Sequence, residues 1–112
     1  MAGTTKRTTG PLALTTTLTT NVYNNASALI YDVIRHIHIT NKTGSAATFT
    51  LYLGATGANA AGTELWVGQN VAANSSFDWY GMLKLTSTDF LVGGSNTATA
   101  LTITIMGEQH VV

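Results

Sequence analysis

Alternating hydrophobic and polar positions between residues 30 and 53 predict two β-strands joined by a tight turn. In the run IHITNKTGSAATFTLYLG, residues 37–54, apolar side chains recur at every second position on both sides of the Asn41-Lys-Thr-Gly44 segment. Successive side chains of a strand point to opposite faces, so this period of two indicates strands, and Asn and Gly at the junction favour a turn. We therefore expect a β-hairpin with strands over residues 30–40 and 48–53.

Strict alternation gives the first of these strands one apolar face and one mixed face. The apolar face, which we expect to point into the core, comprises Val33, Ile37 and Ile39. The mixed face comprises Ile34, His36, His38 and Thr40.

Short apolar stretches separated by turn residues continue along the rest of the chain. Further strands are expected within residues 12–20, with a shift of register, and over 64–67, 77–80, 82–85, 90–92 and 99–106. Turns are expected at 24–25, 87–89 and 93–96, and a loop of small residues at 54–63. This spacing, without any sustained helical period, predicts an all-β, single-domain antiparallel β-sandwich of jelly-roll or Ig-like type.

The polar N-terminal segment is expected to stand apart from the sandwich. Residues 1–12 contain the adjacent cations Lys6 and Arg7 but few apolar positions, so we predict an extended N-terminal arm followed by a domain over residues 13–112. Such an arm is suited to pairing along the sheet edge of a neighbouring subunit, although it can also lie back on its own domain. If it pairs with a neighbour, deleting residues 2–10 should leave the domain folded.

Composition restricts the possible partners. The chain has 112 residues, five basic and five acidic, and a formal net charge of zero, so a basic patch for nucleic acid is not expected. Cysteine is absent, which rules out disulfides and thiolate metal sites, and no apolar run approaches the length of a membrane span. The 21 threonines favour a neutral β-surface that meets other protein.

Candidate chemistry is sparse. No serine has a histidine at a motif spacing and the five carboxylates are scattered, so we predict no catalytic residue, no cofactor and no enzyme activity. His36 and His38 share a strand face and are the candidate metal ligands, with His110 or Glu108 as a third. We favour the alternative that the two histidines pack beside outward threonines, and we expect no bound metal.

Aromatic residues in the middle of the chain are candidates for an interface. Trp66, Trp79 and Tyr80 could belong to the core, to a contact between subunits or to a platform that stacks on sugars. The complete set of interface candidates adds four residues from the N-terminal segment and its continuation: Lys6, Arg7, Leu12 and Leu14.

Three longer runs resemble a group of small β-sandwich virion proteins of tailed bacteriophages and related prophages. These runs are VIRHIHITNKTGSAATFTLYLG, NVAANSSFDWYGMLKLTSTDFL and ALTITIMGE, and the resemblance spans roughly residues 29 to 108. It implies a virion structural protein, first of all a capsid decoration (cement) protein that binds the major capsid protein and stabilises the shell. The alternatives are an accessory ring protein of the neck or tail and a carbohydrate-binding module of a tail or fibre.

For the decoration protein we expect a homotrimer on the outer capsid surface, assembled in the host cytoplasm. The resemblance contributes no catalytic residue.

Overall fold

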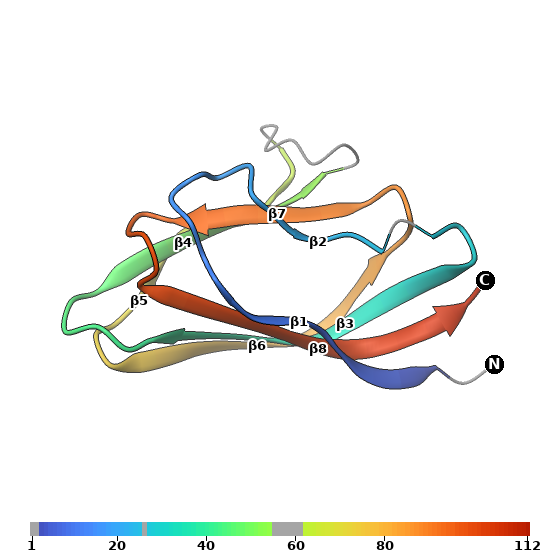
Figure 1. Ribbon diagram of the computed structural model, residues 1–112, viewed down its shortest axis with the longest axis horizontal. Helices are drawn as coiled ribbons and strands as arrows, with labels where there is room; N and C mark the ends of the chain where they lie inside the picture. Colours follow the sequence, from blue (N-terminus) through green and yellow to red (C-terminus); the bar gives the residue numbers. More distant parts are fainter. Residues whose placement is uncertain (1–2, 26, 55–61) are drawn as a thin grey trace.

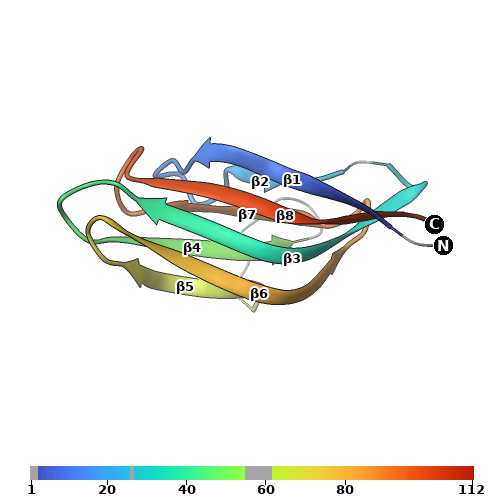
Figure 2. The ribbon, with the colours of Figure 1, turned by 90° about the horizontal axis from the view of Figure 1, so that it is seen from below.

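The computed structural model describes residues 3–25, 27–54 and 62–112 as eight β-strands in two antiparallel sheets packed face to face (Figures 1 and 2). Sheet A has the order β1-β8-β3-β6 and sheet B the order β2-β7-β4-β5. The strands are β1 (Thr4–Ala13), β2 (Asn21–Tyr23), β3 (Ile30–Asn41), β4 (Ala47–Gly54), β5 (Glu64–Val71), β6 (Ser75–Leu85), β7 (Phe90–Ser95) and β8 (Leu101–Val111). The predicted all-β sandwich is therefore confirmed.

The strand pairing is that of a jelly roll. β1 pairs with β8, β2 with β7, β3 with β6 and β4 with β5, so the chain forms a series of nested hairpins. Two further pairings, β3 with β8 and β4 with β7, join these hairpins into the two sheets. Of the two sandwich types expected from the sequence, this topology is the jelly roll and not the Ig-like arrangement. No helix among the described residues could cross a membrane.

An irregularity in β3 corrects the predicted faces of that strand. Its pairing with β8 passes from Ile34 opposite Gly107 to His36 opposite Met106, which leaves Arg35 as an extra residue, a β-bulge. The bulge breaks strict alternation, so Ile34 joins Ile37 in the core, whereas the prediction placed it on the opposite face. Val33, predicted to belong to the core, is buried but lies outside the main cluster.

The hydrophobic core fills the space between the sheets. Its fully buried members come mainly from β3, β4, β7 and β8, and Phe49 is the largest of them. β5 and β6 are the outermost strands at one side of the sandwich. There, Trp66 and Trp79 pack edge to face with ring centroids 5.6 Å apart. Phe77 lies against both Phe49 and Trp66. These four rings cover the core between the edges of the two sheets.

The N-terminal segment is part of the sandwich, which corrects the expectation of a separate arm. β1 lies along β8 of the same chain, with Thr4 opposite Gln109 and Ala13 opposite Thr102. After β1, Leu14 is completely buried, and its amide donates a hydrogen bond to the carbonyl of Leu101. The segment lies back on its own domain, so the domain begins at β1 and not at residue 13.

Other sequence predictions are also corrected. The expected hairpin of residues 30–40 and 48–53 does not form, because β3 and β4 lie in different sheets. The turn expected at 93–96 lies mostly within β7. The strands predicted over 77–80 and 82–85 form one continuous strand, β6, and the strand predicted over 64–67 extends to Val71. The strand expected within 12–20 does not continue beyond Ala13, and a hydrogen-bonded turn around Thr17 follows. The loop predicted at 54–63 lies largely outside the described residues.

Candidate functional site

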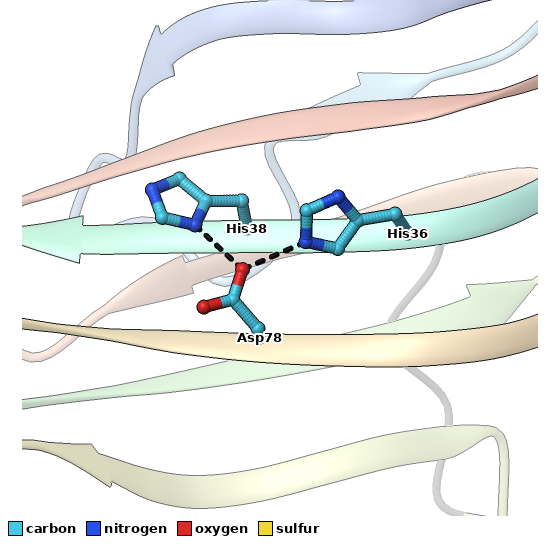
Figure 3. A group of neighbouring side chains, drawn as sticks. All are labelled: His36, His38 and Asp78. Carbon is cyan, nitrogen blue, oxygen red and sulfur yellow. Dashed lines mark hydrogen bonds and ion pairs between the residues drawn. The ribbon is translucent and has the colours of Figure 1, made fainter.

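The outer face of sheet A brings together two histidines and one carboxylate. His36 and His38 alternate in β3 with the buried Ile37 and Ile39, so both imidazoles project away from the core. Asp78 lies on the neighbouring strand β6, directly opposite His38 in the register. Figure 3 shows the two rings reaching from β3 toward the same oxygen of the Asp78 side chain.

Both imidazoles hydrogen-bond to one carboxylate oxygen. Asp78 Oδ1 lies 2.7 Å from His36 Nε2 and 2.7 Å from His38 Nδ1. The other ring nitrogen of His38 lies 2.7 Å from Thr40 Oγ1, and the ring of His36 stacks on Tyr80 with centroids 4.3 Å apart. Each ring is therefore held by two contacts.

The two histidines favour the charged form of Asp78. Hydrogen bonds from His38 and then His36 hold the pKa of Asp78 below its ordinary value, so the carboxylate is ionised at neutral pH. The three side chains are partly exposed, with 20% of the His36 side chain, 36% of His38 and 33% of Asp78 accessible to solvent. Water and small ions can therefore reach the group.

Glu108 and His110, the residues considered as third metal ligands, belong to a separate cluster. Glu108 Oε1 lies 3.3 Å from a guanidinium nitrogen of Arg35 and 3.2 Å from His110 Nε2. The hydrogen bond from His110, followed by that from Arg35, lowers the pKa of Glu108. The ring of His110 also stacks on Tyr31. Among the described residues, Asp78 is the carboxylate that completes the group with His36 and His38.

The sequence could not identify Asp78 as a partner of the histidines. Asp78 is 40 residues from His38, and the two meet only because β3 and β6 pair in one particular register. A change of register by one residue would move the carboxylate to the other face of the sheet. The only sequence signal is the alternation around Phe77 and Trp79, which places residue 78 outward.

A shallow hollow adjoins His38. It has a volume of about 370 Å³ and is lined by residues from the ends of β3 and β6 and the segments next to them: His38, Thr40, Asn41, Lys42, Asn74, Ser75 and Ser76. Its lining combines hydroxyls, amides, the His38 imidazole and the Lys42 ammonium. Such a surface can donate and accept hydrogen bonds, but it has no acid–base pair of its own.

The interface candidates occupy different environments. Leu14 is in the core, and Leu12, Trp66 and Trp79 are partly buried against it. Arg7 and Tyr80 are exposed. The contribution of these residues to a contact with another chain stays a prediction.

Lys6, proposed as an interface residue, participates in a buried polar network within the chain. Its ammonium lies 3.3 Å from Oδ1 of the fully buried Asp32 and donates a hydrogen bond to the Tyr23 hydroxyl. That hydroxyl donates to Asp32 Oδ2 at 2.6 Å, and the Asn25 side-chain amide donates to the same oxygen. Burial, then the hydrogen bond to Asp32 and the charge of Asp32, raise the pKa of Tyr23 well above its ordinary value. No sequence pattern indicates this network, because its members lie on three strands and a loop.

Comparison with known proteins adds no assignment. No protein-family model matches the chain, and a search of curated proteins finds no match. The likeness of the three sequence runs to phage virion proteins therefore remains an expectation.

Proposed function

We propose that this chain is a non-enzymatic structural protein of a tailed-bacteriophage particle, attached to the outer capsid surface as a decoration protein. The resemblance of three sequence runs supports the phage assignment. The jelly roll is compatible with it, because this fold occurs in viral capsid proteins, but it also occurs in lectins and enzymes, so the fold alone does not choose a function. A formal net charge of zero and many threonines are consistent with a surface that contacts other protein.

The proposal of an assembly function rests on the edge of sheet A at β6. β6 is the outermost strand of that sheet, and no described strand pairs with its free edge. Tyr80 and Met82 on this strand are 72% and 68% exposed. An unpaired strand edge with exposed apolar side chains is suited to contact with another chain. We infer that β6 contacts a neighbouring copy or the major capsid protein, with a homotrimer as the expected form.

The geometry favours assembly over sugar binding. A sugar platform requires an exposed aromatic ring, whereas Trp66 and Trp79 pack against each other and against the core. Tyr80 is exposed, but one face of its ring stacks on His36. A ring protein of the neck or tail would use the same fold and differ in symmetry and copy number.

Attachment to shells tests the proposal. Shells depleted of the protein are mixed with the wild-type chain or with a Tyr80→Ser/Met82→Ser double variant, and the bound protein is measured by co-sedimentation. We expect the double variant to bind at least tenfold less, because apolar contacts at the centre of an interface dominate its affinity. Val67→Ser removes an exposed apolar side chain from β5 and should bind normally. Equal binding of all three proteins would refute the use of β6.

The oligomeric state and the position on the particle are measured separately. Light scattering should give the mass of a trimer, and images of intact particles should show the protein in many copies over the shell. A single ring at one vertex would assign it to the neck or tail. A monomer that is absent from particles and is retained by a glycan array would favour the carbohydrate-binding alternative.

A further inference from the structure

Three potential metal ligands converge on the outer face of sheet A. His36 Nε2, His38 Nδ1 and Asp78 Oδ1 all lie within 4.8 Å of one another. They come from two adjacent strands, so their backbone positions are fixed by the pairing of β3 with β6. We propose that His36, His38 and Asp78 bind a Zn²⁺ ion, with water as the fourth ligand. This inference does not depend on the proposed function.

The dimensions of the group suit a tetrahedral ion. Zinc binds imidazole nitrogen and carboxylate oxygen at about 2.0–2.1 Å, which places tetrahedral ligand atoms about 3.3 Å from one another. The carboxylate oxygen is now 2.7 Å from each imidazole nitrogen, so it must move back by about 0.6 Å, while the two nitrogens approach each other. Rotations of partly exposed side chains can supply these shifts without moving either strand.

The surroundings orient both imidazoles for binding. Once Nδ1 of His38 gives its lone pair to the ion, its Nε2–H can donate to Thr40 Oγ1, which lies 2.7 Å away. A partner of this kind fixes the tautomer and the ring orientation of a metal-binding histidine. Tyr80 stacks on His36 with an interplanar angle of 8°, which limits rotation of that ring.

The donor set selects zinc over the alkaline-earth ions. Mg²⁺ and Ca²⁺ prefer six or more oxygen ligands, whereas two imidazoles and one carboxylate are typical of zinc with an open position. The ion would replace two hydrogen bonds to Asp78 with three coordinate bonds. It would thereby connect β6, the outermost strand of sheet A, to β3. We therefore expect zinc to stabilise the edge of the sheet.

Isothermal titration calorimetry with ZnCl₂ on the untagged, metal-free full chain tests the proposal. We expect saturable binding of one ion per chain and, at a zinc concentration 100 times the dissociation constant, a rise in Tm of about 10 °C. MgCl₂ should give neither effect. Co²⁺ in place of zinc should give the visible absorption bands of a tetrahedral site.

Single substitutions locate the site. His38→Ala and Asp78→Asn should each abolish saturable zinc binding and the rise in Tm. Thr40→Val, which removes only the hydroxyl that orients His38, should weaken binding by about 10- to 100-fold. His110→Ala is the matched control, because it removes a histidine that pairs with a different carboxylate, Glu108, and zinc binding should be unchanged.

Circular dichroism without zinc checks that each variant is folded. If His38→Ala is unfolded, zinc binding by Asp78→Asn tests the site instead. The proposal is overturned if the wild-type chain shows no saturable heat at about tenfold molar excess of zinc. It is equally overturned if binding survives in both His38→Ala and Asp78→Asn, or if His110→Ala reduces it as much as they do.

Discussion

A single carboxylate, Asp32, connects three parts of the chain. Lys6 reaches it from β1, Tyr23 from β2 and Asn25 from the following loop, while Asp32 itself lies on β3. The carboxylate is completely buried and receives two hydrogen bonds on Oδ2, with the Lys6 ammonium opposite Oδ1. A buried charge is tolerated only when it is paired and hydrogen-bonded in this way.

Replacing Asp32 by alanine should destabilise the fold. The Tyr23 hydroxyl and the Lys6 ammonium would lose their acceptor and counter-ion in a site with little access to water. We expect a loss of about 2–3 kcal/mol in the free energy of unfolding, because the remaining polar groups stay desolvated without partners. Urea denaturation measures the loss. Glu108→Gln breaks the exposed pair with Arg35 and should change the midpoint little; an equal effect of the two substitutions would argue against a special contribution of Asp32.

Tyr23 should make the fold sensitive to alkaline pH. Its pKa is raised in the folded chain, so above about pH 10 the unfolded chain ionises this tyrosine while the folded chain does not. The stabilisation is complete below pH 10 and is lost as the pH rises toward the folded pKa. Urea midpoints measured from pH 8 to 11.5 should therefore fall more steeply for the wild type than for Tyr23→Phe. If the urea midpoints of the two proteins fell in parallel as the pH rises, this contribution of Tyr23 would be refuted.

At the level of strands, the bulge in β3 depends on a glycine in its neighbour. Gly107 of β8 lies opposite Ile34, immediately before the extra residue Arg35. A Cβ atom at Gly107 would lie 2.1 Å from the carbonyl oxygen of Val33, a backbone atom that cannot move away without disturbing the pairing. Only glycine allows β8 to approach β3 this closely.

Gly107→Ala should therefore be costly. We expect a loss of about 2–3 kcal/mol in the free energy of unfolding from the steric conflict with β3. Gly44→Ala is the control, because a Cβ atom there would meet nothing within 4 Å. Thermal unfolding of the two variants compares them directly. Similar Tm values would mean that the two strands can separate without penalty at this point.

The same strands indicate which features the sequence could predict. Alternation and turn residues predicted strands at β3, β4 and β8, since these patterns are local, but the predicted pairing of β3 with β4 was wrong, because the two strands lie in different sheets. The bulge at Arg35 has no compositional signature, so strict alternation predicts the wrong face for Ile34. β1 was missed because its inward Lys6 is charged and is satisfied by Asp32, a partner distant in sequence. Asp78 is likewise distant from the histidines in sequence, and their contact depends on the register of β3 and β6, which the sequence does not reveal.

For the whole molecule, the position of β1 makes the N-terminal segment structural. Deleting residues 3–9 would remove the pairing of β1 with β8 from Thr4 to Thr9, together with the counter-ion of Asp32. We expect this deletion to lower the urea midpoint more than Asp32→Ala does, because the pairing of β1 with β8 and the polar network around Asp32 are lost together. Serine at both Thr4 and Thr5, which are exposed, is the control. A deleted chain as stable as the wild type would restore the interpretation of a dispensable arm.

The nested hairpins also determine how the domain resists force. β1 and β8 are antiparallel neighbours, and the start of β1 lies opposite the end of β8, with Thr4 facing Gln109 (Figure 1). Tension applied through these two ends would load the hydrogen bonds between the strands one after another, as a zipper opens, because the bonds run perpendicular to the strands. We expect extension by optical tweezers to detach β1 at low force. A lattice built from this domain would therefore resist swelling only if the load entered elsewhere than through these two ends.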